Sequence, residues 1–230
     1  MHRLGHVVWN DIDADHPPLL LVPIGSCEQH GPHLPLDTDK RIAVAIAEQV
    51  AEVAVPGRML VAPAIGVTSS GEHAGFPGTL SIGLEATELV LVELVRSADW
   101  SGGVVFINGH GGNRAAVENA LTIVTAEDRS VMSWWPRIRR ADAHAGRTET
   151  SLMLAIAPEL VRLSAAEQGN VTPVAELFER LTEDGVRAVS PNGVLGDPTG
   201  ASADEGKRLF DALVVDASLR IGAWTASLGR

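Results

Sequence analysis

The chain has 230 residues, 45% of them hydrophobic and 20% charged, a globular balance that argues against disorder and predicts one folded domain over residues 1–230. Its formal net charge at pH 7 is −11 and its basic residues are scattered, which argues against nucleic acid as a partner. The single cysteine, Cys27, excludes an intramolecular disulfide and a thiolate zinc cluster, so any metal must be held by His and carboxylate side chains.

Membrane and export signals are not evident in the sequence. No apolar run approaches the roughly 20 residues that a membrane-spanning helix needs, and the opening residues lack the apolar core of a signal peptide. We therefore expect a cytoplasmic protein that has no membrane partner.

Short apolar runs closed by Gly or Ser alternate with stretches of helical spacing through the first two thirds of the chain. After Gly169 the sequence predicts loop, followed by one late helix from about Ala203. Before that point, in chain order, we expect a strand at 18–25, a helix at 39–53, a strand at 59–64, a helix at 85–97, a strand at 102–108, a helix at 113–125, a strand at 131–135 and a helix at 148–157.

The alternation of strands and helices predicts an α/β fold with a mostly parallel sheet covered by helices on both faces. In such sheets, binding sites lie in the loops that follow the carboxyl ends of the strands. We therefore expect the site in the loops after residues 18–25 and 102–108.

Those two loops carry His and carboxylate residues. Glu28 and His30 follow the first strand and are two residues apart, so on extended backbone they point the same way. Asp39 returns from the start of the next helix, and His110 follows the third strand between glycines that let the backbone bend. A lone Glu-x-His occurs by chance in many chains, but two loops of this kind favour a metal site built from these four residues.

The mixture of imidazole and carboxylate suits Zn²⁺, Mn²⁺ or Fe²⁺ better than Mg²⁺ or Ca²⁺. The number of carboxylates suggests two ions, with Asp39 able to bridge them. Two such ions deprotonate a water and polarise a carbonyl oxygen. The chemistry expected is hydrolysis of an amide through attack by a metal-bound hydroxide.

The chain resembles the creatininase family, because the motifs GSCEQHGPHLPLDTD, SGEHAGFPGTLSIG, NGHGGN and DAHAGRTETSLML occur in that order with the family's spacing. The resemblance spans about residues 23–157. It implies a three-layer α/β/α subunit, a two-metal centre and a homo-oligomer. It also implies that Glu28, His30, Asp39 and His110 are ligands, with Asp39 bridging.

The chain departs from the family at one position. Creatinine amidohydrolases carry a metal-binding Glu two residues after the His of the NGHGGN loop, and this chain has Gly112 there. The resemblance makes Glu149, in HAGRTETS, the expected ligand of the second ion and a catalytic residue. Alternatively, Glu149 is a first-turn helix residue stabilised by the helix dipole.

His144 precedes the same helix, and the resemblance gives it the task of passing a proton to the departing nitrogen, for which a pKa near neutrality is suitable. Alternatively, its ring only forms a hydrogen bond with Asp142 or backbone. Asp142 is expected to orient His144 in either case.

The sequence allows more than one role for each of several further residues. His33 and His73 fit a functional role and a structural hydrogen-bonding role equally well, and Cys27 is more simply a packed residue than a nucleophile. Trp134 and Trp135 could stack on a substrate or fill a core or subunit interface. Arg147 could bind an acidic peptide segment or pair with a neighbouring carboxylate.

Within the family, the carboxyl half is most similar to the mycofactocin-precursor peptidases. That likeness implies a modified precursor peptide as substrate, cleaved before its modified C-terminal Val-Tyr pair. One alternative is a family hydrolase acting on a small cyclic amide or a formamide, although Gly112 counts against creatinine itself. Another is a metal-holding binding or assembly protein without turnover.

Overall fold

The computed structural model describes residues 2–54, 57–139 and 141–229, and within them it contains a four-stranded parallel sheet. The strand order is β2-β1-β3-β4, so the first and third strands lie side by side at the centre. The strands are β1 (Leu19–Ile24), β2 (Met59–Val61), β3 (Val104–Asn108) and β4 (Val131–Trp134).

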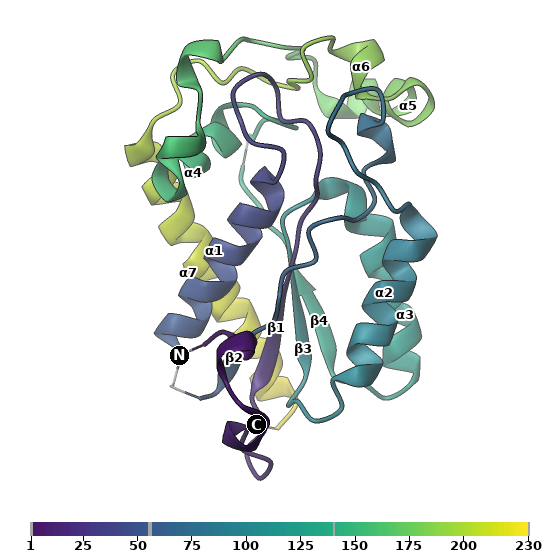
Figure 1. The fold of residues 1–230 in the computed structure, drawn as a ribbon, viewed down its shortest axis with the longest axis vertical. Coiled ribbons are helices and arrows are strands. Elements are labelled where there is room, and N and C mark those ends of the chain that lie inside the picture. Colours follow the sequence, from purple (N-terminus) through teal and green to yellow (C-terminus); the bar gives the residue numbers. More distant parts are fainter. Residues whose placement is uncertain (1, 55–56, 140, 230) are drawn as a thin grey trace.

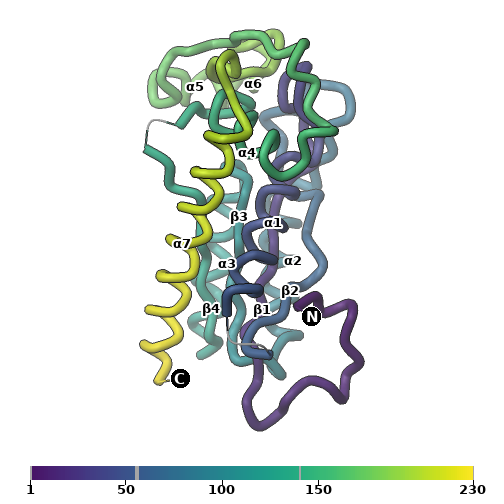
Figure 2. Tube along the Cα trace, turned by 90° about the vertical axis from the view of Figure 1, so that its left-hand side faces the viewer, coloured from purple at the N-terminus to yellow at the C-terminus, as the bar shows by residue number. Residues whose placement is uncertain are grey.

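Helices cover both faces of this sheet, which gives three layers (Figure 1). Helix α7 runs along the molecule beside α1, and α2 packs with α3 on the opposite face (Figures 1 and 2). The helices are α1 (Thr38–Val53), α2 (Leu84–Ser97), α3 (Arg114–Ala126), α4 (Arg147–Ile156), α5 (Val174–Asp184), α6 (Val186–Val189) and α7 (Ala203–Ser227).

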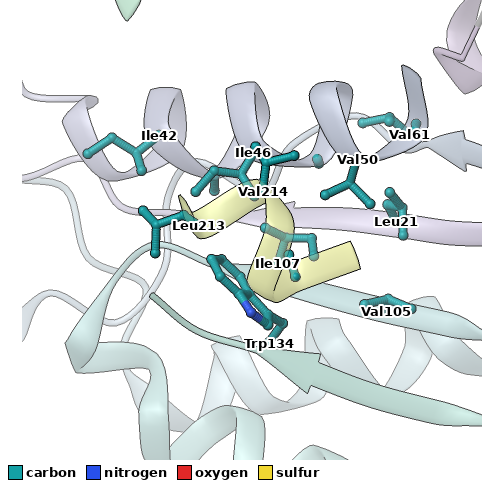
Figure 3. Close-up of a cluster of buried hydrophobic side chains, with 14 of the residues drawn as sticks. Leu21, Ile42, Ile46, Val50, Val61, Val105, Ile107, Trp134, Leu213 and Val214 are labelled. Carbon is teal, nitrogen blue, oxygen red and sulfur yellow. The ribbon is translucent and has the colours of Figure 1, made fainter. Parts of the chain in front are cut away.

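Two apolar cores lie on the two faces of the sheet. Alternate residues of β1 enter different cores, as the two-residue period of a strand requires: Leu21 faces α1 and α7, whereas Leu20 faces α2 and α3. Trp134, only 2% exposed, packs in the first core with Ile107 (Figure 3). Its indole N–H donates to Asp216 at 2.8 Å, so Trp134 is a core residue and does not stack on a substrate.

The predicted α/β architecture with a parallel sheet is confirmed, and the predicted strands and helices occur within a few residues of their expected bounds. The prediction of loop after Gly169 is wrong, because α5 and α6 fall within it. Helix α5 has apolar residues at Val174, Leu177, Phe178 and Leu181, the spacing of an amphipathic helix. Leu177 and Leu181 pack in a third small apolar cluster.

The centre of the sheet sets up the site. Ile24 pairs with Asn108, so β1 and β3 end level with each other and the loops that follow them start side by side. The start of α1 lies so close to Gly25 and Gly109 that a Cβ on either glycine would overlap its backbone. These two glycines therefore allow Asp39, in the first turn of α1, to lie between the two loops.

Among the helices in the described ranges, none is long and apolar enough to cross a membrane.

Candidate metal centre

Asp39 lies at the middle of a buried cluster of His and carboxylate side chains. Its Oδ1 is 3.0 Å from Nε2 of His30, and its Oδ2 is 3.0 Å from Nδ1 of His110. The hydroxyl of Ser26 donates to Oδ2 at 2.8 Å and fixes the carboxylate. One carboxylate thus faces two imidazoles with separate oxygens, which is the arrangement expected of a bridging ligand.

Each of these imidazoles is held by a backbone carbonyl on its far side. Nδ1 of His30 lies 3.1 Å from the carbonyl oxygen of Glu28, and Nε2 of His110 lies 2.8 Å from that of Ser69. With one ring proton on the carbonyl side, the other ring nitrogen faces Asp39 and becomes available to a metal once it loses its proton. Metal-binding histidines are oriented in this way by their outer partners.

Glu28 is fully buried, and neither of its carboxylate oxygens has a hydrogen-bond partner among the described residues. Its Oε1 lies 3.2 Å from Nδ1 of His110 and 3.4 Å from Nε2 of His73. A buried carboxylate without donors is costly unless a cation compensates it. The donor set of this cluster therefore fits a divalent metal ion.

The ligand atoms divide into overlapping groups, in each of which all atoms lie within 4.8 Å of one another. Two groups share Asp39: one consists of Glu28, Asp39 and His110, and the other of His30, Asp39 and Glu149. Two more share Glu28: one with His30 and His144, and one with Glu72 and His73. The structure therefore brings the five residues predicted as ligands together, on two sides of Asp39.

Charge in the cluster is strongly coupled. Burial opposes ionisation of every member, yet the charge of His110 lowers the pKa of Glu28 to about 2. Burial likewise disfavours a charged His30, but Asp39 raises its pKa to about 10. Protons on the imidazoles therefore balance the carboxylates in the metal-free protein, and a metal must displace them.

Glu149 lies in the first turn of α4, on the His30 side of the cluster. Its Oε2 is 4.0 Å from Nε2 of His30 and accepts a 2.6 Å hydrogen bond from the backbone N–H of Ala145. Burial raises the pKa of Glu149 to about 7, against the opposing charge of His30. A cation beside this carboxylate would favour its ionised form again, so Glu149 is placed to act as a metal ligand.

His144 lies over the centre of the cluster. Its ring centroid is 4.2 Å from that of His30 and 4.5 Å from that of His73. Its Nε2 donates to the carbonyl oxygen of Gln29 at 2.8 Å, which leaves Nδ1 free, 3.8 Å from Glu28. Burial, helped by the charge of His30, lowers the pKa of His144 well below its ordinary value, so its ring is neutral in the metal-free protein.

The expectation that Asp142 orients His144 is wrong. The Asp142 carboxylate accepts a hydrogen bond from the backbone N–H of Arg147 and thereby holds the start of α4. The carbonyl of Gln29 takes the orienting role. Arg147 pairs with Glu205 at 2.8 Å.

The side chain of Gln29 was not anticipated from the sequence. Its amide nitrogen donates to Nδ1 of His73 at 2.8 Å and to the carbonyl of Gly193 at 3.0 Å. Its amide oxygen accepts from the N–H of Gly31 at 2.9 Å. Gln29 thus ties the loop after β1 to the C-terminal half and fixes His73, whose pKa burial lowers to about 4 against the opposing charge of Glu28.

His33 and Cys27 lie outside the metal-binding groups described here. Nε2 of His33 is 2.8 Å from the hydroxyl of Thr150, a contact that joins the loop after β1 to α4. The thiol of Cys27 lies 3.7 Å from the carbonyl of Gly78.

Glu72 is a second residue that the sequence reading missed. It lies in a short 3-10 turn, Gly71–His73, and its Oε1 is 3.6 Å from Nε2 of His110. The signal available was its place beside His73 in the motif SGEHAGFPGT, but nothing in the local pattern relates that loop to His110.

Comparison with known proteins gives a consistent result. The family model for creatinine amidohydrolase (creatininase) matches residues 6–220. The chain is 50% identical to a mycofactocin precursor peptide peptidase of Mycolicibacterium smegmatis, over 90% of this chain and 85% of that protein. It is 46% identical to the protein of the same name in Mycobacterium tuberculosis, over 90% and 86%. A crystal structure of creatinine amidohydrolase superposes with a TM-score of 0.82 at 24% identity, covering 96% of each chain.

Proposed function

The chain belongs to the creatininase family, and from that premise we propose that it is a metal-dependent hydrolase that cleaves a peptide bond in the mycofactocin precursor peptide. The substrate is taken from the names of relatives that are 46% to 50% identical over most of this chain. The bond we propose is the one before the modified C-terminal Val-Tyr pair.

The observation that supports metal-dependent hydrolysis most directly is the position of Asp39 between His30 and His110, with one oxygen toward each ring. We propose that one divalent ion is held by Glu28, Asp39 and His110. A second ion would be held by His30, Asp39 and Glu149. Zn²⁺, Fe²⁺ and Mn²⁺ all suit this mixture of nitrogen and oxygen donors.

When bound, the two ions supply an activated water and polarise the carbonyl under attack. The protein's own part is to exclude solvent from Glu28, His30 and Asp39, all of which are buried, and to hold them in place before substrate arrives. His144 would act as the proton carrier. Its Nε2–H is engaged by the Gln29 carbonyl, so Nδ1 is the atom that accepts a proton and delivers it to the departing nitrogen.

We also propose a homo-oligomer. Helix α7 exposes Val215 and Leu219, one turn apart and 58% and 69% accessible, and a second subunit could cover them. Sedimentation of the purified protein at micromolar concentration tests this, and a monomer there would refute it.

The substrate assignment is tested by incubating metal-loaded protein with the modified precursor peptide, its unmodified form, creatinine and a formamide. We expect mass spectrometry to show a single cut near the end of the modified peptide and slow or no reaction of the others. Protein stripped of metal by a chelator is the control and should be inactive. Rapid hydrolysis of creatinine or the formamide without peptide cleavage would favour a small-amide hydrolase instead, and metal binding without any turnover would favour a binding protein.

A further inference from the structure

Gly112 and Glu72 meet at the edge of the metal cluster, although 40 residues separate them in the sequence. A Cβ built on Gly112 would overlap Oε1 of Glu72 and Nε2 of His110. The carboxylate of Glu72 therefore occupies the space into which a side chain at position 112 would project. Glycine at position 112 leaves that space to Glu72, whereas any larger residue would compete for it.

A positive charge beside Glu72 would be stabilised, because another carboxylate, that of Glu28, lies close to it. Its carboxylate belongs with Glu28 and His73 to a group whose ligand atoms lie within 4.8 Å of one another. Glu28 in that group is completely buried, its oxygens have no hydrogen-bond partner of good geometry within the described ranges, and the His110 ring, 3.2 Å away, is the charge that compensates it until a metal displaces the ring proton. Two carboxylates this close repel each other, and burying one without a donor adds a further cost, unless a cation lies between them.

The ion proposed on the His110 side has three ligands among the predicted residues and therefore has room for another protein ligand. Glu28, Asp39 and His110 give it three donors, and the other three-residue group of Asp39, with His30 and Glu149, lies on the opposite side. Oε1 of Glu72 lies 3.6 Å from Nε2 of His110, whereas Glu28 and Asp39 face Nδ1, so Glu72 has to move toward the ion to bind it; its side chain is 30% exposed, which leaves it room to do so. Its turn is joined to His110 through Ser69, whose carbonyl is 2.8 Å from the ring.

We propose that Glu72 is a direct ligand of the ion held by Glu28, Asp39 and His110, and that it provides the carboxylate which Gly112 cannot. This inference rests on the two-ion function proposed above. The site would then combine three carboxylates with one imidazole, and Gly112 would be glycine because its missing side chain makes room for Glu72.

The test is the metal content and affinity of Glu72→Gln, which removes the charge and keeps the size of the side chain. Equilibrium dialysis against Mn²⁺ or Zn²⁺, followed by elemental analysis, should show one ion per chain where the parent protein holds two. Glu159→Gln is the matched control, because Glu159 also lies in a 3-10 turn but is exposed and belongs to none of the metal-binding groups. It should keep the parent content.

The size of the effect separates a ligand from an outer partner of His110. Loss of an outer hydrogen-bond partner weakens metal binding by about 10- to 100-fold, so a direct ligand should cost more than about 100-fold for one ion. A smaller loss, or none, overturns the proposal.

A double variant identifies the ion concerned. Glu149→Gln should remove the ion on the His30 side, and adding Glu72→Gln should leave no firmly bound ion. One firmly bound ion in the double variant would mean that both changes act on the same ion, and this would overturn the assignment. These readouts do not depend on any substrate, so a failure to cleave the precursor peptide would count against the proposed function and not against Glu72.

Discussion

Glu149 and His30 lie together on one side of the candidate metal centre, with Oε2 of Glu149 4.0 Å from Nε2 of His30. If this gap holds an ion, Glu149→Gln should fold normally, bind one ion where the parent binds two, and hydrolyse substrate far more slowly. If Glu149 serves only the helix dipole, metal content should be unchanged and the free energy of unfolding should fall by about 0.3 to 1 kcal/mol. Elemental analysis and urea unfolding separate the two results.

Glu85→Gln is the control for that experiment, because Glu85 is also a first-turn glutamate but lies exposed at the start of α2. It should show the small loss of stability without any loss of metal. Unchanged metal content and activity in Glu149→Gln would remove Glu149 from the site.

His144→Ala should keep both ions and lose about 10²- to 10⁴-fold in turnover, the usual contribution of a positioned proton-transfer group. The reason is that Nδ1 of His144 is free and faces the cluster while Nε2 is held by the Gln29 carbonyl. Turnover on the precursor peptide and metal content are the measurements. His16→Ala, at an exposed residue paired with Asp13, is the control and should behave as the parent. Near-normal turnover in His144→Ala would reduce His144 to a structural residue.

Much of the fold could be predicted because the sequence alternates short apolar runs with helical spacing. The Gly- and Pro-rich composition that predicts loop is confined to residues around 190–202, whereas α5 and α6 precede them. Val174, Leu177 and Leu181 have the spacing of one helix face, and this local signal was available.

The candidate site was predictable where it depends on strand ends, and not where it depends on distant loops. Glu28 and His110 follow two strands that lie side by side, so topology alone brings them together. Glu72 approaches His110 only because a separate loop folds over the space left at Gly112. Gln29 lies between two predicted ligands, but its partner Gly193 is 164 residues away and the pairing has no local signal.

Gly193→Ala should displace Gln29, which positions residues beside the metal centre, without removing any proposed metal ligand. Gly193 has a φ of +80°, and a Cβ there would overlap the amide of Gln29. We expect a loss of about 1 to 3 kcal/mol in the free energy of unfolding and at least a tenfold drop in turnover, with both ions retained. Denaturant titration, peptide turnover and metal analysis provide the three readouts.

Gly222→Ala is the matched comparison, since Gly222 lies inside α7 with no neighbouring atom near the new Cβ. That variant should gain about 0.5 to 1 kcal/mol, because alanine favours the helix, and turnover should not change. Normal turnover in Gly193→Ala would show that the contact between Gln29 and Gly193 does not support catalysis.

The stability of the metal-free protein should depend on pH through His33. Burial, helped by the charge of His30, lowers the pKa of His33 to about 4 in the folded state, from an ordinary value near 6.5. Between these values the unfolded chain binds a proton that the folded protein does not, so stability falls as pH falls from about 6.5 to about 4.

His33→Gln cannot take up this proton, and glutamine can still reach the Thr150 hydroxyl with which His33 is paired. Urea unfolding at several pH values should therefore show the parent losing about 1 to 3 kcal/mol more than His33→Gln across this window. Because the other histidines of the cluster titrate in both proteins, the difference between the two curves isolates His33. Parallel curves would mean that His33 binds its proton equally well in the folded and unfolded chain, and that its burial carries no cost.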